Sequence, residues 1–160
     1  MKRKTLLIWI NLAVALLLAG TLLAQAQESL FGTWKMNEAK SKYSVGTVPK
    51  SNIAKWERFQ GGVKLTVDVV PAKGETQHYE SSGKFDGKDN PVKGNNPDGD
   101  TMAFSKIDAR TYEAVTKKSG KTTLTGHIVV AADGKTRITT QTGKNGQGET
   151  VTNTMFYEKQ

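Results

Sequence analysis

Residues Gly61–Val70, GGVKLTVDVV, carry the clearest structural pattern in the sequence. Val63, Leu65, Val67 and Val69 alternate with residues that are mostly polar, and two glycines precede them. Because successive side chains of a β-strand point to opposite faces, this alternation predicts a strand with one buried face. The glycine pair predicts a tight turn before it, since glycine adopts the positive φ angles that hairpins require.

Similar turn signals recur roughly every 12 residues, between runs rich in Thr and Val. Turns this close together leave no room for the crossovers of parallel strands, so we expect antiparallel strands joined in order. Helices are disfavoured, because Leu30, Leu65 and Leu124 are the only leucines after residue 26. The turn signals are Gly61-Gly62, Lys73-Gly74, Asp86-Gly87, Asp98-Gly99, Ser119-Gly120, Asp133-Gly134 and Asn145-Gly146.

These signals divide the chain after residue 26 into expected strands and one irregular segment. Between Met36 and Asn52 we expect a lid-like segment, or a helical turn capped by Asn37 and followed by a loop. Pro49 ends any helix there. The expected strands lie near Leu30–Met36, Ile53–Gln60, Val63–Val70, Glu75–Phe85, Asn90–Lys93, Thr101–Ile107, Tyr112–Lys118, Thr122–Ala132, Thr136–Thr142 and Glu149–Tyr157.

About eight to ten sequential strands must bury one face of their sheet. The sheet either closes into an antiparallel up-and-down barrel or folds into a two-layer sandwich. Sequential hairpins favour the all-β, lipocalin-like barrel, because sandwiches mostly use Greek-key connections. The expected inner face contains Thr, Ser, Asn and Gly. A cavity that holds water or a ligand explains these residues, and so does a one-residue error in strand phase around a packed core.

The first 26 residues have the three zones of a secretory signal peptide, which we expect to form a helix. Residues 2–4 are basic, residues 6–23 are mostly apolar, and Ala24-Gln25-Ala26 fits a signal peptidase. We expect cleavage after Ala26, a periplasmic or secreted location, and one domain over residues 27–160. Membrane contact is then limited to the peptide before cleavage. An uncleaved anchor is the alternative, because the apolar run is about long enough to span a bilayer.

Charge and cysteine content exclude several classes of protein. The net charge of +8 falls to +5 without the three basic residues at the start of the chain, and it is scattered. No nucleic-acid partner is expected, because such partners require a basic stripe. The absence of cysteine excludes disulfides, thiolate catalysis and a lipid-modified cysteine. We expect a monomer.

No metal site, catalytic centre or cofactor is predicted. His78 and His127 lie far apart and lack the spacing of metal ligands, and no nucleophile elbow occurs. Four aspartates between residues 86 and 100 supply oxygen atoms of the kind that calcium binds, but aspartate also dominates turns. We favour the turn interpretation for them.

The segment Phe31-Gly32-Thr33-Trp34 resembles the Gly-x-Trp motif at the first strand of lipocalins and their relatives. The resemblance implies a barrel whose floor is closed by Trp34, with Gly32 beside it. Lipocalins also carry a Thr-Asp-Tyr-like motif, an arginine after the last strand and a C-terminal helix. These are missing here, and Arg137 precedes the last expected strand, so the ligand class of lipocalins is not carried over.

A wider set of segments is similar to an exported bacterial family of lipocalin-like (calycin-type) β-barrels that has no assigned activity. This resemblance covers most of residues 27–160 and implies the barrel but no function. The segments are Gly32–Tyr43, Pro49–Ser51, Phe85–Asp89, Ala132–Lys135 and Tyr157–Lys159.

Aromatic residues are the candidates for a ligand site. Trp56 and Arg58 share one face of an expected strand. If that face points inward, its aromatic and cationic wall suits an anionic amphiphile such as a fatty acid. If it does not, Trp56 covers a rim and Arg58 is solvated. The candidate ligand-binding residues are Trp56, Arg58, Tyr79, Phe104 and Tyr112.

Three functional hypotheses follow. The first is an exported binding protein that holds a small hydrophobic or amphiphilic ligand in a barrel cavity. The second is a protein-interaction or inhibitor module of the cell envelope, with a packed core and no ligand. The third and least favoured is a cofactor-free enzyme that uses the cavity, because no titratable pair with a clear role is visible.

Overall fold

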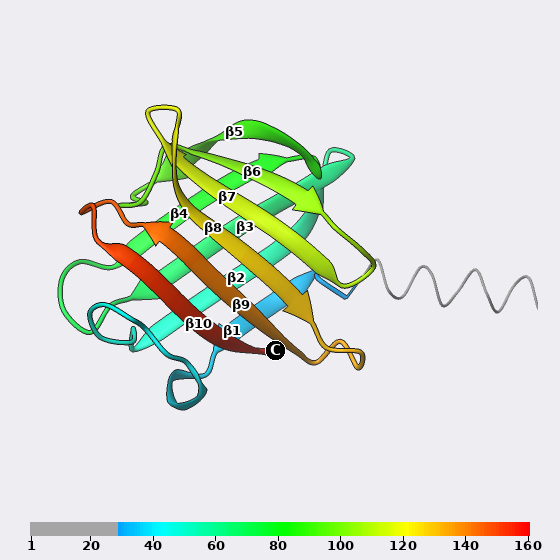
Figure 1. The fold of residues 1–160 in the computed structure, drawn as a ribbon. Coiled ribbons are helices and arrows are strands. Elements are labelled where there is room, and N and C mark those ends of the chain that lie inside the picture. The colour runs from blue at the N-terminus through cyan, green and yellow to red at the C-terminus, as the bar shows by residue number, and fades with distance from the viewer. Residues whose placement is uncertain (1–28) are drawn as a thin grey trace, which may run out of the picture.

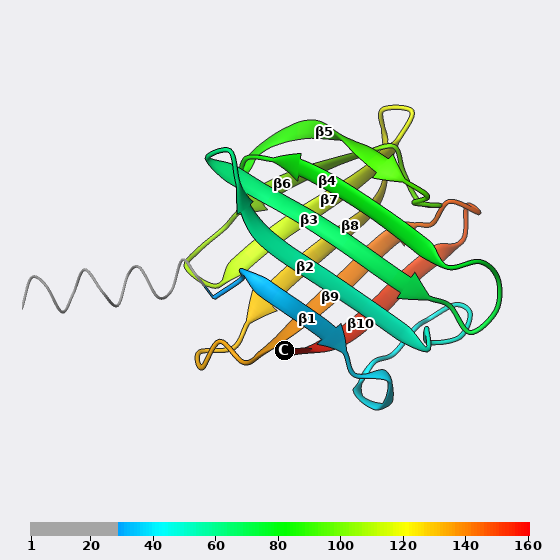
Figure 2. The same ribbon diagram turned by 180° about the vertical axis from the view of Figure 1, so that it is seen from behind.

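A computed structural model describes residues 29–160, which form an all-β barrel (Figures 1 and 2). One short 3₁₀-helix, η1 (Glu38–Lys40), interrupts the strands. The ten strands of the described part are β1 (Gly32–Met36), β2 (Ser51–Phe59), β3 (Gly62–Val70), β4 (Gln77–Gly83), β5 (Asp86–Gly94), β6 (Thr101–Lys106), β7 (Thr111–Lys118), β8 (Lys121–Val130), β9 (Thr136–Lys144) and β10 (Thr150–Lys159).

The strands are antiparallel and follow one another around the barrel in chain order. Closure depends on β1, which pairs with β2 along one edge and with β10 along the other. Trp34, for example, lies opposite Ala54 on β2 and Lys159 on β10. The prediction of an up-and-down barrel is therefore confirmed, and the two-layer sandwich is excluded.

The alternation read from the sequence marks the faces of the barrel wall correctly. Val63, Leu65, Val67 and Val69 of β3 all point to the buried side. On β8 the positions Leu124, Ile128 and Val130 are likewise buried, and on β10 Val151, Asn153, Met155 and Tyr157 face inward. The inner surface therefore contains a polar residue on β10 in addition to the apolar ones.

The region of β4 and β5 differs from the prediction. Asp86-Gly87 is not a turn but the start of β5, where the pairing with β6 shifts register between Asp86 and Asp89. The turn that connects β4 and β5 lies at Lys84-Phe85, directly before the expected position, because β4 ends at Gly83 and β5 begins at Asp86. The cause is composition: most of β5 is polar and exposed, so no alternation of apolar residues marks its beginning.

The segment between β1 and β2 is a helical turn followed by a loop, as one of the two sequence interpretations predicts. Asn37 caps η1 by accepting a hydrogen bond from the Lys40 backbone N–H at 3.1 Å. Lys42 then exchanges two backbone hydrogen bonds with Thr154 of β10, each 2.8 Å long. These bonds hold the loop against the barrel beside its open end.

The opposite end of the barrel is its floor and is filled by large side chains. Trp34 is completely buried there and donates a hydrogen bond from Nε1 to the Leu30 carbonyl at 2.7 Å. Gly32 has a φ of +131°, which strains any residue with a Cβ, and such a Cβ would also displace the end of the Lys159 side chain. The other fully buried floor residues are Leu30, Val63, Phe104, Tyr112 and Val130.

The expected signal peptide, residues 1–26, lies outside the described residues. Among residues 29–160, no helix has the length and apolar character needed to cross a membrane.

We predict that Trp34→Ala lowers the free energy of unfolding by about 3–5 kcal/mol, because it leaves a large void in a fully buried floor. Urea denaturation followed by circular dichroism measures this change. Phe59→Ala is the matched control, since Phe59, the last residue of β2, is 43% exposed and its loss costs only about 1 kcal/mol. Equal losses in the two variants contradict the assignment of Trp34 to the floor.

Candidate functional site

Above the floor, the barrel encloses a cavity of about 310 Å³. It opens at the end where loop 71–76 and the β9–β10 turn lie, at the left of Figure 1. The lining changes along the barrel axis from a cationic group at the inner end, through an apolar belt, to a polar mouth. The sequence left a hollow and a packed interior open, and the structure has the hollow one.

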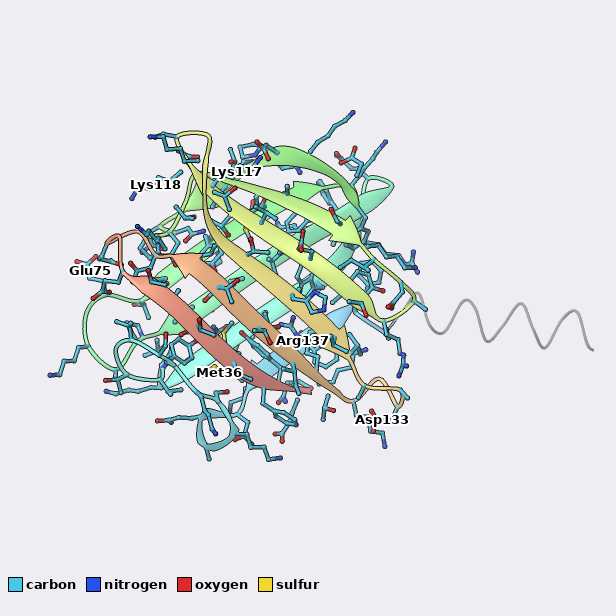
Figure 3. The ribbon with its side chains drawn as sticks, in the orientation of Figure 1. Met36, Glu75, Lys117, Lys118, Asp133 and Arg137 are labelled. Atoms are coloured by element: carbon cyan, nitrogen blue, oxygen red, sulfur yellow. The ribbon has the colours of Figure 1, made fainter. Side chains whose placement is uncertain are left out.

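The inner end of the cavity is formed by Arg137 of β9 and Tyr157 of β10, which are register partners. The Arg137 guanidinium carbon lies 4.1 Å from the centre of the Tyr157 ring and 5.3 Å from that of the Trp34 ring. Only 3% of Arg137 is exposed. Figure 3 shows it within the outline of the barrel, whereas Lys118, Glu75 and Asp133 lie at the barrel ends.

Hydrogen bonding satisfies Arg137 only in part. One Nη donates to the Thr139 hydroxyl at 3.4 Å, which is long for such a bond, and the buried Nε has no partner among the described residues. Burial lowers the pKa of Arg137 to about 10, and the nearby Tyr157 opposes that shift. The guanidinium therefore stays charged at neutral pH.

The middle of the cavity is an apolar belt contributed by strands on opposite sides of the barrel. Trp56 of β2 packs edge-on against Phe104 with ring centres 5.6 Å apart, and its buried Nε1 has no partner among residues 29–160. The remaining members of the belt are Ala54, Leu65, Val67, Met102, Ala114, Leu124, Gly126, Ile128 and Met155.

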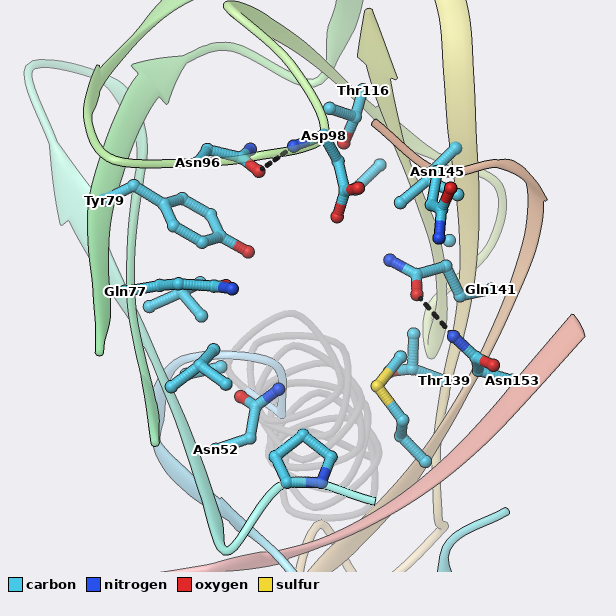
Figure 4. Close-up of a pocket in the computed structure, with 18 of the residues that line it drawn as sticks. Asn52, Gln77, Tyr79, Asn96, Asp98, Thr116, Thr139, Gln141, Asn145 and Asn153 are labelled. Atoms are coloured by element: carbon cyan, nitrogen blue, oxygen red, sulfur yellow. Dashed lines mark hydrogen bonds between the residues drawn. The ribbon is translucent and has the colours of Figure 1, made fainter. Parts of the chain in front are cut away.

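The mouth is lined by amide, hydroxyl and carboxylate groups (Figure 4). Asn153 donates to the Gln141 side chain at 3.1 Å, whereas the buried Oδ1 of Asn52 has no partner within the described chain. Tyr79 points its hydroxyl into the opening. Burial raises the pKa of Tyr79, with smaller contributions from Tyr157 and Asp98, so its hydroxyl remains a donor at neutral pH.

Asp98 links three elements at the mouth. Its side chain accepts a hydrogen bond from the Gly146 backbone N–H at 2.8 Å, and its carbonyl accepts one from the Thr123 hydroxyl at 2.7 Å. The Asn96 side chain in turn accepts from the Asp98 N–H at 3.0 Å. The residues around Asp98 therefore fix the β5–β6 loop against β8 and the β9–β10 turn.

The structure brings together only part of the ligand site predicted from sequence. Trp56 and Tyr79 line the cavity, while Phe104 and Tyr112 are buried beneath it. Arg58 lies beyond the cavity, where its guanidinium is 4.8 Å from the centre of the Phe31 ring. The aromatic and cationic wall exists, but its cation is Arg137.

The sequence does not reveal Arg137 as a cavity residue, because the apolar Ile138 beside it suggests that Ile138 is the residue that faces inward. Ile138 is 45% exposed on the outside of the barrel, while Arg137 and Thr139 point inward. The signal that finds Arg137 is the β9–β10 hairpin, whose register places it opposite the inward-facing Tyr157. The mouth amides were missed because such residues also suit exposed turns.

Asp86, Asp89 and Asp100 act as turn and surface residues, whereas Asp98 lines the mouth of the cavity. Asp89 pairs with Lys117 at 2.7 Å, and Asp100 accepts from the Ser119 N–H at 2.9 Å. His78 contacts Asp68 at 2.7 Å on the outer surface. Within residues 29–160, no group of three His, Cys, Asp or Glu side chains is placed to hold a metal ion.

Three comparisons with known proteins returned no match: no family model, no curated protein and no solved structure matches this chain. No family is therefore identified, and function has to be argued from the cavity itself.

We predict that Asp98→Ala loosens the mouth, because the Gly146 N–H loses its side-chain acceptor. Amide hydrogen exchange at Gly146 should rise, and the free energy of unfolding should fall by about 1 kcal/mol. Asp98→Asn is the control, since its amide oxygen still accepts this bond. If exchange at Gly146 is unchanged in Asp98→Ala, Asp98 does not hold the loop.

Proposed function

We propose that this chain is an exported binding protein that holds one small organic molecule of mixed polarity inside the barrel. Five buried side-chain polar atoms lack a partner in the described chain, and the observation that carries the proposal is that three of them lie on residues that line this cavity, whereas Ser81 Oγ and Thr101 Oγ1 do not. The three are Asn52 Oδ1, Trp56 Nε1 and Arg137 Nε. Unpaired buried polar atoms are costly, and a bound molecule that pairs with them offsets that cost.

The size and lining of the cavity agree with such a ligand. A volume of about 310 Å³ is at the lower end of the range for small-molecule sites. It corresponds to roughly ten water molecules in the liquid. Apolar walls with a few convergent polar groups are the usual composition of ligand sites, because the walls supply affinity and the polar groups fix orientation.

The rival hypotheses receive less support. An interaction or inhibitor module was expected to have a packed core, and the barrel interior is hollow instead. A cofactor-free enzyme needs an acid or base poised against its substrate. The mouth offers Asp98 and the nearby Tyr79, but the Asp98 carboxylate is held by the Gly146 backbone, and burial raises the pKa of Tyr79 away from neutral pH.

Filling the cavity tests the proposal. Gly126 lines it, and a Cβ there meets the Ala114 carbonyl and the Thr139 methyl at 3.6 and 3.7 Å, which are ordinary contacts. Gly126→Leu therefore extends its side chain into the cavity, while Gly126→Ala adds one methyl group and is the matched control. We expect both variants to keep a free energy of unfolding within about 1 kcal/mol of the wild type.

The probe is Prodan, a neutral dye whose emission shifts to the blue in apolar surroundings. We predict a saturable blue shift with the wild type and with Gly126→Ala, and at least about tenfold weaker binding by Gly126→Leu. Equal affinity in all three proteins rules out the cavity as the binding site of the dye.

A further inference from the structure

We propose that the bound molecule is a small organic acid whose carboxylate pairs with Arg137 at the inner end of the cavity. This inference rests on the proposed function and adds the charge and orientation of the ligand. The acid group enters first, and the opposite end of the molecule remains at the mouth.

The geometry of Arg137 leaves its donors available. The rings of Tyr157 and Trp34 lie within 5.3 Å of its guanidinium carbon, and such cation–π contacts supply no oxygen acceptor for its N–H groups. The N–H groups lie at the edge of the guanidinium plane, where a carboxylate is bound by two parallel hydrogen bonds. Within residues 29–160, the one hydrogen bond found for these N–H groups is that to Thr139, at 3.4 Å.

The charge of Arg137 has no counterion in the described chain. Other basic residues do have carboxylate partners, including Lys40 with Glu158 at 3.1 Å and Lys117 with Asp89 at 2.7 Å. No carboxylate of residues 29–160 forms an ion pair with Arg137, although it is far more buried than either lysine. A buried charge is normally paired, so an anion from outside the chain is the missing partner.

The rest of the cavity specifies the remainder of the molecule. The apolar belt that includes Trp56 suits an aromatic or alkyl middle. At the mouth, Asn52, Gln141 and Tyr79 offer amide and hydroxyl partners, while Asp98 repels a second acid group. A monocarboxylic acid with a hydroxyl or amide at its far end meets all of these conditions.

The spacing of Arg137 and Gln141 along β9 indicates the length of the ligand. Arg137 and Gln141 are four residues apart on the same inward face. At the usual rise of a strand this corresponds to roughly 13 Å between their Cα atoms. A molecule of the length of a phenylpropanoic acid spans the belt between them.

The test compares 3-(4-hydroxyphenyl)propanoate with its uncharged amide, which has nearly the same shape. Isothermal titration calorimetry on the wild type should show the acid binding about tenfold to a hundredfold more tightly. Arg137→Met keeps much of the side-chain volume without the charge, and should abolish this preference. Arg110→Met is the matched control, because Arg110 lies in the exposed β6–β7 turn and its loss leaves the preference unchanged.

Each outcome decides between two claims. Equal affinity for acid and amide in the wild type overturns the inference about Arg137 and leaves a ligand-binding barrel. The same conclusion holds if Prodan binds but neither the acid nor the amide does. Failure of all three compounds to bind overturns the proposed function as well. A preference that persists in Arg137→Met shows that another group selects the acid and also overturns the inference.

A merely structural Arg137 is distinguished in the same experiment. If Arg137→Met does not fold, Arg137→Lys keeps the charge but loses the planar fork, and it should retain a weaker preference for the acid. The ratio of the wild-type affinities for the acid and the amide requires no variant, and by itself it decides whether Arg137 selects a carboxylate. A structural role alone gives a ratio near one.

Discussion

The fold depends on the pairing of β1, a strand of five residues, with β2 on one side and β10 on the other. Without this strand, β2 and β10 would both expose unpaired backbone groups, and such edges invite aggregation. Closure also gives the inner face an interior. Trp34 lies on the same short strand, so the residue that fills the floor is fixed by the hydrogen bonds that close the wall. The closed wall and the filled floor of the barrel therefore both depend on β1.

The polar interior costs stability. Arg137, Asn52 and Trp56 each bury a polar atom without a partner in the described chain, and each such unpaired atom costs about 1–3 kcal/mol. A protein that needed only a stable barrel would fill this space with Val, Leu and Ile. Conflicts with the rules of stable packing are expected where function requires them, and three of the five buried polar atoms without partners in the described chain lie around this cavity.

Much of the fold was predictable because the alternation in β3, β8 and β10 and the glycine turns act locally. The limits of β5 were not predictable, since a strand that is polar on both faces carries no periodic signal. Trp56 and Tyr79 were predictable as cavity residues from their type. Arg137 was not, because its inward direction follows from pairing with Tyr157, and the exposed Ile138 beside it suggests the opposite phase.

Native mass spectrometry of the protein purified from its own host tests most directly whether the closed barrel holds a ligand. We expect one small organic acid to be retained per chain, released on denaturation and absent from Arg137→Met. A bare polypeptide mass that persists even after incubation with excess hydroxyphenylpropanoate would contradict it.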